Sequence, residues 1–155
     1  MRLPRLFLTL TLTLLAFTGC QTNFRLSAIT VSLVELRPAA AASAGNQVVL
    51  KLHFSSANVL AVAVEDTTHK LYLNGTYVGR SVNPKAIGLP ALGSVDQEVT
   101  LQLENRAVVT QILQAADRRP VAYSLESRLN IQVEDAYEYY NTTQKGTVDL
   151  SALAP

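Results

Sequence analysis

The sequence predicts an all-β fold, an antiparallel β-sandwich of about seven strands with one short helix between late strands. Polar and apolar residues alternate along Val121–Val133, and a tight-turn dipeptide, Asn74-Gly75, divides another apolar segment. Only Arg106–Ala116 carries apolar residues at helical spacing. Alternation with a period of two indicates strands that have one face on a core and the other in water, and a series of such strands is typical of a sandwich.

The expected strands are spread along most of the chain. They are Leu26–Leu36, Val48–Phe54, Leu60–Val64, the two arms of a hairpin at Leu71–Gly79, Val99–Leu103, Val121–Val133 and Thr147–Leu150. In Val48–Phe54 the even-numbered residues are apolar and are expected to face the core, whereas His53 faces outward. In Val121–Val133 the odd-numbered residues are expected to face inward.

The hairpin carries the sharpest local signal. Asn74 and Gly75 tolerate the positive φ angles of a two-residue type I′ turn. Closing this turn gives three expected pairs, which are Leu73 with Thr76, Tyr72 with Tyr77, and Leu71 with Val78. Tyr72 and Tyr77 then form a cross-strand aromatic pair on the face opposite the apolar residues, and such a pair contributes about 0.2–1 kcal/mol.

The predicted helix, Arg106–Ala116, joins two late strands. Its apolar positions include Val109 and Ile112, and Pro120 follows soon after its end. Asn105 precedes it and is a suitable N-cap residue. We expect the apolar stripe of this helix to close one end of the core.

Three segments lack strand periodicity and are expected to be loops, namely Pro38–Asn46, Asn83–Ser94 and Asp135–Lys145. The last overlaps a cluster of three acidic residues and three tyrosines at residues 134–141. Because exposed tyrosines are favoured in interfaces, Tyr137, Tyr139 and Tyr140 are candidate partner contacts, as are Tyr72 and Tyr77. Two alternatives remain for the cluster: tyrosines that cover one end of the fold, and a calcium site, which EF-hand spacing does not support.

Residues 1–19 have the layout of a secretory signal. Arg2 and Arg5 precede an apolar stretch of about a dozen residues, after which small residues follow. The stretch is shorter than the roughly 20 apolar residues of a transmembrane helix. We therefore expect a signal peptide at 1–19, a short tether at 20–23 that begins with Cys20, and a single domain at 24–155.

The end of this signal, Ala16-Phe-Thr-Gly-Cys20, resembles the lipobox of bacterial lipoproteins. The resemblance implies cleavage before Cys20 and acylation of that cysteine with fatty acids such as palmitate. Gln21 in place of Asp implies transport to the outer membrane, with the domain facing the periplasm. Several acyl chains on one residue anchor a protein stably, so the membrane becomes a partner. An uncleaved anchor, or ordinary secretory cleavage that leaves a free thiol, are the alternatives.

Charge and cysteine content exclude several classes of function. The 155 residues include 13 Lys and Arg against 12 Asp and Glu. Removal of the 19 signal residues takes away two arginines and leaves 136 residues with a net charge of −1. That balance gives no electrostatic case for nucleic-acid binding. A single cysteine excludes a disulfide framework and a cysteine-rich zinc site within the chain.

Catalytic chemistry is not visible in the pattern of reactive residues. Cys20 is assigned to the anchor, and His53 and His69 lack the spacing of metal ligands and are expected to be surface histidines. Glycines are spaced as turns and do not form a phosphate-binding loop. We expect no enzyme activity, no cofactor, no metal and no small-molecule substrate.

Six short motifs in residues 26–151 carry a family resemblance when they are taken together. They are Leu71-Tyr-Leu-Asn-Gly75, Val78-Gly79, Gly88-Leu-Pro-Ala-Leu-Gly93, Val99-x-Leu-x-Leu103, Tyr123-x-Leu125 and Gly146-Thr-Val-Asp-Leu150. Their order resembles the late embryogenesis abundant (LEA) type 2 family, also called the water stress and hypersensitive response (WHy) domain. The resemblance implies an immunoglobulin-like or fibronectin III-like sandwich without a catalytic centre. It also implies protection during desiccation and related stress, and bacterial members of the family are often exported lipoproteins.

The expected function is that of a non-enzymatic, membrane-anchored lipoprotein that protects or binds client proteins of the cell envelope under desiccation or related stress. The alternative is a structural or accessory envelope lipoprotein with one dedicated protein partner in an assembly or transport complex. In either case the open edges of the sheet can accept an extended segment of another protein by strand addition. The sequence does not choose between the edges.

Overall fold

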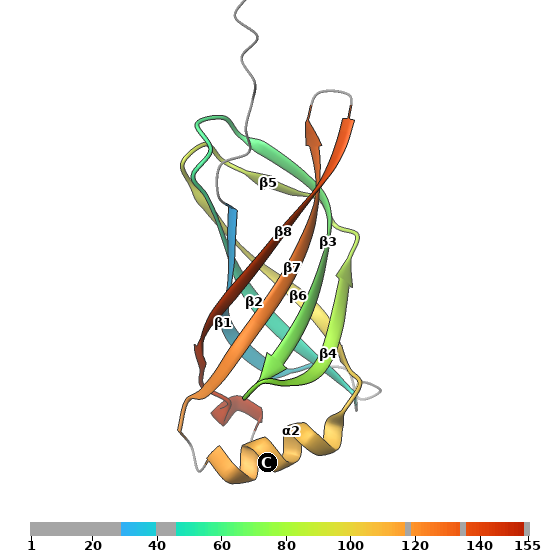
Figure 1. The fold of residues 1–155 in the computed structure, drawn as a ribbon, viewed down its shortest axis with the longest axis vertical. Helices are drawn as coiled ribbons and strands as arrows, with labels where there is room; N and C mark the ends of the chain where they lie inside the picture. Colours follow the sequence, from blue (N-terminus) through green and yellow to red (C-terminus); the bar gives the residue numbers. More distant parts are fainter. Residues whose placement is uncertain (1–28, 40–45, 117–118, 134–135, 154–155) are drawn as a thin grey trace, which may run out of the picture.

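The computed structural model describes residues 29–39, 46–116, 119–133 and 136–153 (Figure 1). Its elements are β1 (Ile29–Pro38), β2 (Gln47–Ser56), β3 (Val62–Leu73), β4 (Thr76–Asn83), β5 (Ile87–Leu89), β6 (Ser94–Leu103), α2 (Arg106–Ala116), β7 (Val121–Val133), β8 (Ala136–Val148) and a 3₁₀ turn η1 (Ser151–Leu153). The signal segment, Cys20, the tether and most of the predicted Pro38–Asn46 loop lie outside the described residues.

The strands belong to one antiparallel sheet in the order β1-β2-β6-β4-β3-β7-β8, and β5 pairs with β3. The sheet coils until β8 lies beside β1, so that it becomes nearly closed and barrel-like (Figure 1). The all-β, antiparallel prediction is confirmed. The two packed sheets of an immunoglobulin-like or fibronectin III-like sandwich are not confirmed, because the described strands form one continuous sheet. Register shifts in β1 and β3 add local twist, which favours such coiling.

The core fills the inside of the coiled sheet. Leu50, Leu52 and Phe54 on β2 are fully buried, as predicted, and the inward positions of β7 from Val121 to Ile131 are buried as well. Helix α2 closes one end of the core with Val109 and Ile112. These predictions are confirmed, and so is the N-cap.

The N-cap of α2 is Asn105. The backbone N–H of Val108 donates to Asn105 Oδ1 at 3.3 Å, which satisfies one of the amides that the first turn leaves free. Among the described residues, no helix has the length and the apolar content that crossing a membrane requires.

Two strands are longer than the sequence indicated. β3 runs without interruption from Val62 to Leu73, although only its two ends were predicted. The loop predicted at Asp135–Lys145 is wrong, because β8 pairs with β7 along all of Ala136–Val148. This strand carries mostly polar side chains and therefore lacks the expected alternation, but tyrosine and threonine favour extended backbone. A short strand, β5, also lies within the predicted Asn83–Ser94 loop.

The β3–β4 hairpin has the predicted turn. Asn74 and Gly75 have φ angles of 48° and 78°, and the first two expected pairs, Leu73 with Thr76 and Tyr72 with Tyr77, are present. The third expected pair is wrong. A β-bulge next to Tyr72 sets Leu71 opposite Gly79, and Val78 becomes buried in the core.

Candidate binding surfaces

Tyr137 and Tyr139 lie on the outer face of β8. Their exposed fractions are 62% and 60%, and the guanidinium of Arg128 on β7 lies 3.6 Å from the centre of the Tyr139 ring. The interaction of a cation with a ring face holds Tyr139 in one orientation. The two tyrosines therefore project from a paired strand, and not from the solvated loop that was predicted.

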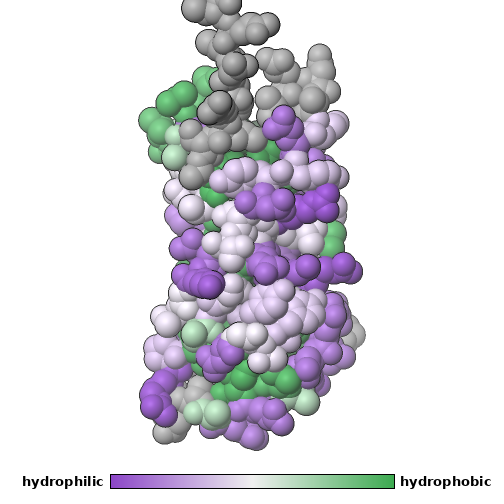
Figure 2. Space-filling model, in the orientation of Figure 1, coloured by the Kyte–Doolittle hydropathy of each residue, from purple (hydrophilic) through white to green (hydrophobic). Residues whose placement is uncertain are grey.

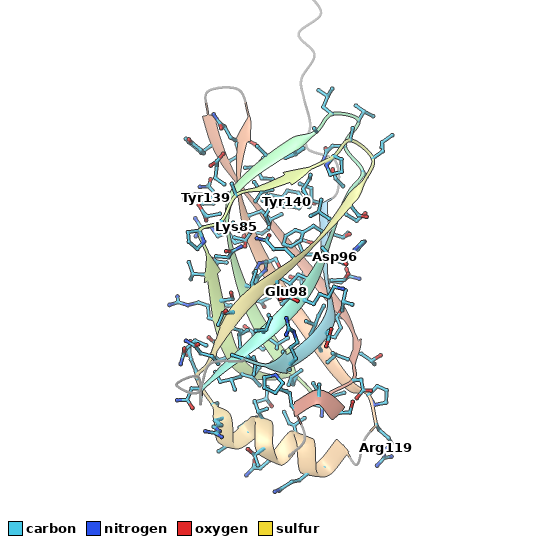
Figure 3. The ribbon with its side chains drawn as sticks, turned by 180° about the vertical axis from the view of Figure 1, so that it is seen from behind. Lys85, Asp96, Glu98, Arg119, Tyr139 and Tyr140 are labelled. Carbon is cyan, nitrogen blue, oxygen red and sulfur yellow. The ribbon has the colours of Figure 1, made fainter. Side chains whose placement is uncertain are left out.

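Tyr140 has a different environment, because neighbouring strand residues point to opposite faces. It is half-buried against the core, and its hydroxyl accepts a hydrogen bond of 3.2 Å from the backbone N–H of Ile29 on β1. Figure 3 shows Tyr139 at the edge of the molecule and Tyr140 nearer its middle. Tyr140 closes the seam between the last and the first strand, so it is not free to contact a partner.

Tyr72 and Tyr77 lie near the opposite end of the outer face. Their ring centres are 5.5 Å apart, which confirms the predicted aromatic pair. Tyr72 faces Ser124 on β7, whereas Tyr137 faces Gln132 on the same strand. Eight residues of strand separate these positions, or about 27 Å. The structure therefore does not bring the five predicted tyrosines into one site.

Both hydroxyls of this pair are held by carboxylates. Tyr72 donates to Glu126 at 3.3 Å and Tyr77 donates to Glu104 at 2.8 Å. The pKa of each tyrosine is raised above its ordinary value. Partial desolvation is the largest cause, and the neighbouring carboxylate adds to it. Both side chains thus present neutral, oriented hydroxyl groups at the surface.

An open groove of about 430 Å³ runs over the outer face between the two tyrosine groups. It is lined by side chains that include Lys70, Arg80, Val82, Arg128 and Thr142. Figure 2 shows that the face formed by β7 and β8 is predominantly polar. The groove is therefore suited to contacts with a polar, extended segment more than to enclosure of a small molecule.

The edge of β6 that faces β4 is only partly paired. The β4–β6 ladder contains two residue pairs, Gly79 with Leu103 and Arg80 with Gln102. Beyond them the upper part of β6, Ser94–Val99, is paired with β2 alone among the described strands. The buried amide groups of two side chains on these strands, Asn83 Nδ2 and Gln97 Oε1, have no hydrogen-bond partner in the described part of the chain.

The outer face of β1, β2 and β6 carries a row of ion pairs. Arg37 contacts Glu98 at 2.6 Å, and Asp96 contacts His53 at 2.7 Å and Lys51 at 3.5 Å. Figure 3 shows Asp96 and Glu98 on β6. The hydrogen bond with His53 lowers the pKa of Asp96, and Lys51 contributes to the same shift. His53 lies on an outward strand position, as predicted.

The expectation that His69 is a surface histidine is wrong. His69 is fully buried, and its Nδ1 and Nε2 atoms lie 2.8 Å from Ser127 Oγ and 2.9 Å from Thr67 Oγ1. Its ring meets Phe54 edge-to-face at 6.0 Å. Burial lowers the pKa of His69 to about 4, so the ring is neutral at physiological pH. The hydroxyls on the inward positions satisfy both ring nitrogens, and this network joins β3 to β7.

The remaining reactive groups form no cluster in the described ranges. No three His, Cys, Asp or Glu side chains there lie close enough together to hold a metal ion. Cys20 lies outside the described residues, so its predicted lipidation stays a prediction. The open β6 edge was missed by sequence reasoning, because it depends on the register of strands that are far apart along the chain.

Similarity to known proteins is limited to the fold. No family model and no curated protein matches the sequence. The solution structure of a protein from Arabidopsis thaliana has a TM-score of 0.55 at 13% sequence identity, covering 82% of this chain and 87% of that chain.

Two further solved structures match less closely. A crystal structure from Archaeoglobus fulgidus has a TM-score of 0.48 at 11% identity, covering 82% of this chain and 98% of that chain. A protein described as a candidate LEA protein has a TM-score of 0.46 at 11% identity, covering 79% of this chain and 71% of that chain. At such identities a likeness concerns the fold alone, and the two lower scores carry no argument about function.

Proposed function

We propose that this protein is a lipid-anchored, non-enzymatic component of the bacterial cell envelope. Its LEA type 2-like domain binds and protects other envelope proteins during desiccation or related stress. The anchoring part rests on the basic and apolar segment that ends at Cys20. Location at the outer membrane, facing the periplasm, follows from the same segment. The protective part rests on the motifs between Leu71 and Leu150 that resemble the family.

The observation that carries protein binding is the unpaired edge of β6. A strand edge presents a row of backbone N–H and C=O groups, which can pair with an extended segment of another chain. The ladder to β4 stops after Arg80–Gln102, so the backbone of Ser94–Val99 has no strand partner on this side among the described residues. Asp96 and Glu98 place charges along this edge, which limits indiscriminate association between edges.

Side chains beside the edge supply further contacts for a bound segment. Asn83 Nδ2 and Gln97 Oε1 are buried in the unbound chain and have no partner in the described structure, so each can form a hydrogen bond to a segment that enters between β4 and β6. Val82, with an exposed fraction of 61%, offers apolar contact next to the same opening. Recognition through backbone hydrogen bonds depends little on sequence, which suits a protein that binds many clients.

Site-specific photocrosslinking in cells tests this assignment. A benzophenone amino acid is placed at Val82, beside the edge, at Tyr139 on β8, and at Gln114 on the exposed surface of α2 as the matched control. We expect Val82 to capture several envelope proteins, and to capture more of them during drying. Gln114 should capture none above background. Absence of crosslinks at Val82 would overturn binding at the β6 edge.

The same experiment separates the proposed function from the alternative. One stoichiometric species, captured at Tyr139, would support a dedicated partner, because the Arg128–Tyr139 contact presents an oriented aromatic anchor. Protection is measured independently by drying an unrelated enzyme with the purified protein. Recovery of activity no better than with an equal mass of an inert protein would contradict the protective role.

Anchoring has its own test. Cells that express the wild type or Cys20→Ala are supplied with labelled palmitate. The wild type should take up label and the variant should not. A labelled Cys20→Ala protein would contradict the assignment of Cys20 as the lipidated residue.

A further inference from the structure

One end of the molecule carries an uncharged, apolar tip. The loop between β2 and β3 exposes Val59 and Leu60, and the loop between β5 and β6 exposes Leu92, with exposed fractions of 73%, 58% and 69%. Residues 57–61 and 90–93, which form these loops, include no charged side chain. The two loops are joined, because the backbone N–H of Leu92 donates to the C=O of Asn58 at 2.8 Å. Figure 2 shows hydrophobic residues gathered at this end.

Leu92 has a backbone conformation that does not favour leucine. Its φ angle is +48°, in the left-handed region where a side chain larger than that of glycine or asparagine costs free energy. Among the residues that the structure describes, the other non-glycine residue at positive φ is Asn74, which suits its turn. Because the Leu92 side chain is exposed, packing within the described chain does not explain its presence. A strained, exposed leucine instead indicates a contact outside the chain.

The tip lies where the described chain begins. Ile29, the first residue of β1, pairs with Ser56, and the N–H of Ser56 donates to the C=O of Gly93 at 2.9 Å. Ile29 therefore lies opposite the residue that precedes the first apolar loop, and that residue is bonded to the last residue of the second loop. Ile29 follows Cys20 by nine positions, and even a fully extended segment of that length spans only about 30 Å. Helix α2 is at the opposite end (Figure 1).

We propose that Val59, Leu60 and Leu92 form a membrane-docking tip that inserts into the lipid surface beside the anchor. The orientation rests on the proposed lipidation of Cys20, which keeps this end of the molecule near the bilayer. Uncharged apolar loops partition into the interfacial region by burial of apolar area, without a requirement for anionic lipid. The docked molecule presents the β6 edge sideways and α2 toward the periplasm.

Fluorescence quenching tests the docking. The lipidated chain with Leu60→Cys, or with Thr110→Cys on α2 as control, is labelled with an environment-sensitive dye. It is then incorporated into vesicles of phosphatidylethanolamine and phosphatidylglycerol that contain brominated acyl chains. We expect quenching at position 60 and none at position 110. Equal quenching at both positions, or none at either, would overturn the proposal.

The dye-to-protein ratio distinguishes failure of docking from failure of anchoring. A lipidated Cys20 has no free thiol, so each chain should carry one dye. A ratio of two would show that anchoring has failed, whatever the quenching result. A ratio of one without quenching at position 60 would show an anchored molecule whose tip does not dock.

Vesicle sedimentation gives an independent measurement that needs no lipid on the protein. In the Cys20→Ser chain, Leu60→Ser combined with Leu92→Gly should lower partitioning into the same vesicles by at least about tenfold. Val34→Ser, which removes an exposed apolar side chain from the middle of β1, away from the tip, should change it little. A change in oligomeric state without a change in vesicle binding would show that a second copy covers the tip, and would overturn membrane docking.

Discussion

The hydroxyl of Tyr140 on β8 accepts a hydrogen bond of 3.2 Å from the backbone N–H of Ile29 on β1. A second tyrosine acts in the same way, because the hydroxyl of Tyr123 on β7 accepts a bond of 3.2 Å from the N–H of Leu33. The described strands form no ladder between β1 and β8. Side-chain hydroxyls therefore satisfy backbone donors that would otherwise be left unpaired beside the core.

Removal of the Tyr140 hydroxyl should weaken this seam. Tyr140→Phe retains the ring and leaves the Ile29 amide without its acceptor, so we expect a loss of about 1 kcal/mol in the free energy of unfolding. The matched control is Tyr139→Phe, whose ring stays over Arg128 and whose loss should be smaller than about 0.5 kcal/mol. Urea denaturation of both variants gives the comparison. Equal stability of the two variants would show that the Tyr140 hydroxyl has no role in the seam.

Gly146 is required by the packing of Tyr123. A Cβ atom at position 146 would lie 2.9–3.1 Å from atoms of the Tyr123 ring, so Gly146→Ala must displace the ring that reaches Leu33. We expect a loss of about 1–3 kcal/mol. Gly88→Ala is the control, since a Cβ there meets nothing within 4 Å. Thermal unfolding should show a lowered midpoint for the first variant and a nearly unchanged one for the second.

The pKa of His69 makes stability depend on pH. Burial lowers this pKa from 6.5 to about 4, so as the pH falls the unfolded chain binds a proton before the folded chain does. The contribution of His69 to the free energy of unfolding is complete above pH 6.5 and declines down to about pH 4. Each unit in that window lowers it by about 1.4 kcal/mol, which amounts to about 2 kcal/mol at pH 5.

Denaturation at about pH 7.5 and about pH 5 measures this decline, and two substitutions assign it. His69→Gln should remove the part of the pH dependence that comes from residue 69, whereas His53→Gln, at an outward position, should retain it. If wild type and His69→Gln lose equal stability between the two pH values, the assignment to His69 is wrong.

Backbone strain at Leu92 predicts a stabilising substitution. Leu92→Gly relieves the positive φ angle and removes no buried contact, so it should raise the free energy of unfolding by about 0.5–1 kcal/mol. Leu60→Gly is the control, because residue 60 does not have a positive φ angle and glycine there adds freedom to the unfolded chain. Chemical denaturation should show opposite signs for the two changes. A destabilised Leu92→Gly would show that the leucine has a structural role.

Local patterns in the sequence predicted the elements that carry a strong periodic or turn signal. The alternation in β7, the Asn74-Gly75 turn and the Asn105-capped helix each depend on neighbouring residues, and each was found as expected. Only the end of β8, at Thr147 and Val148, fell within an expected strand. The rest was missed because its outward side chains are polar and its inward ones include few aliphatic residues, so its pairing with β7 determines its conformation. The burial of His69 also depends on partners from other segments.

Features set by the register of distant strands could not be predicted. One continuous sheet and two packed sheets have similar strand patterns, and the difference lies in which strands pair. The open edge of β6 exists because the β4–β6 ladder has only two pairs, which no local pattern encodes. The tyrosines were identified correctly as exposed at positions 137 and 139, but alternation along β8 turns Tyr140 inward.

The incomplete closure between β1 and β8 leaves β1 with a strand ladder on one side only. Its one complete ladder is to β2, and on its other side the bonds given by Ile29 and Leu33 go to tyrosine hydroxyls. Amide protons of Ile29 and Leu33 should therefore exchange with solvent deuterium faster than those in the middle of β7, which is paired on both sides. Detachment of β1 would uncover one edge of β2 while the β3–β7–β8 ladders remain, so we expect subglobal unfolding to begin at β1.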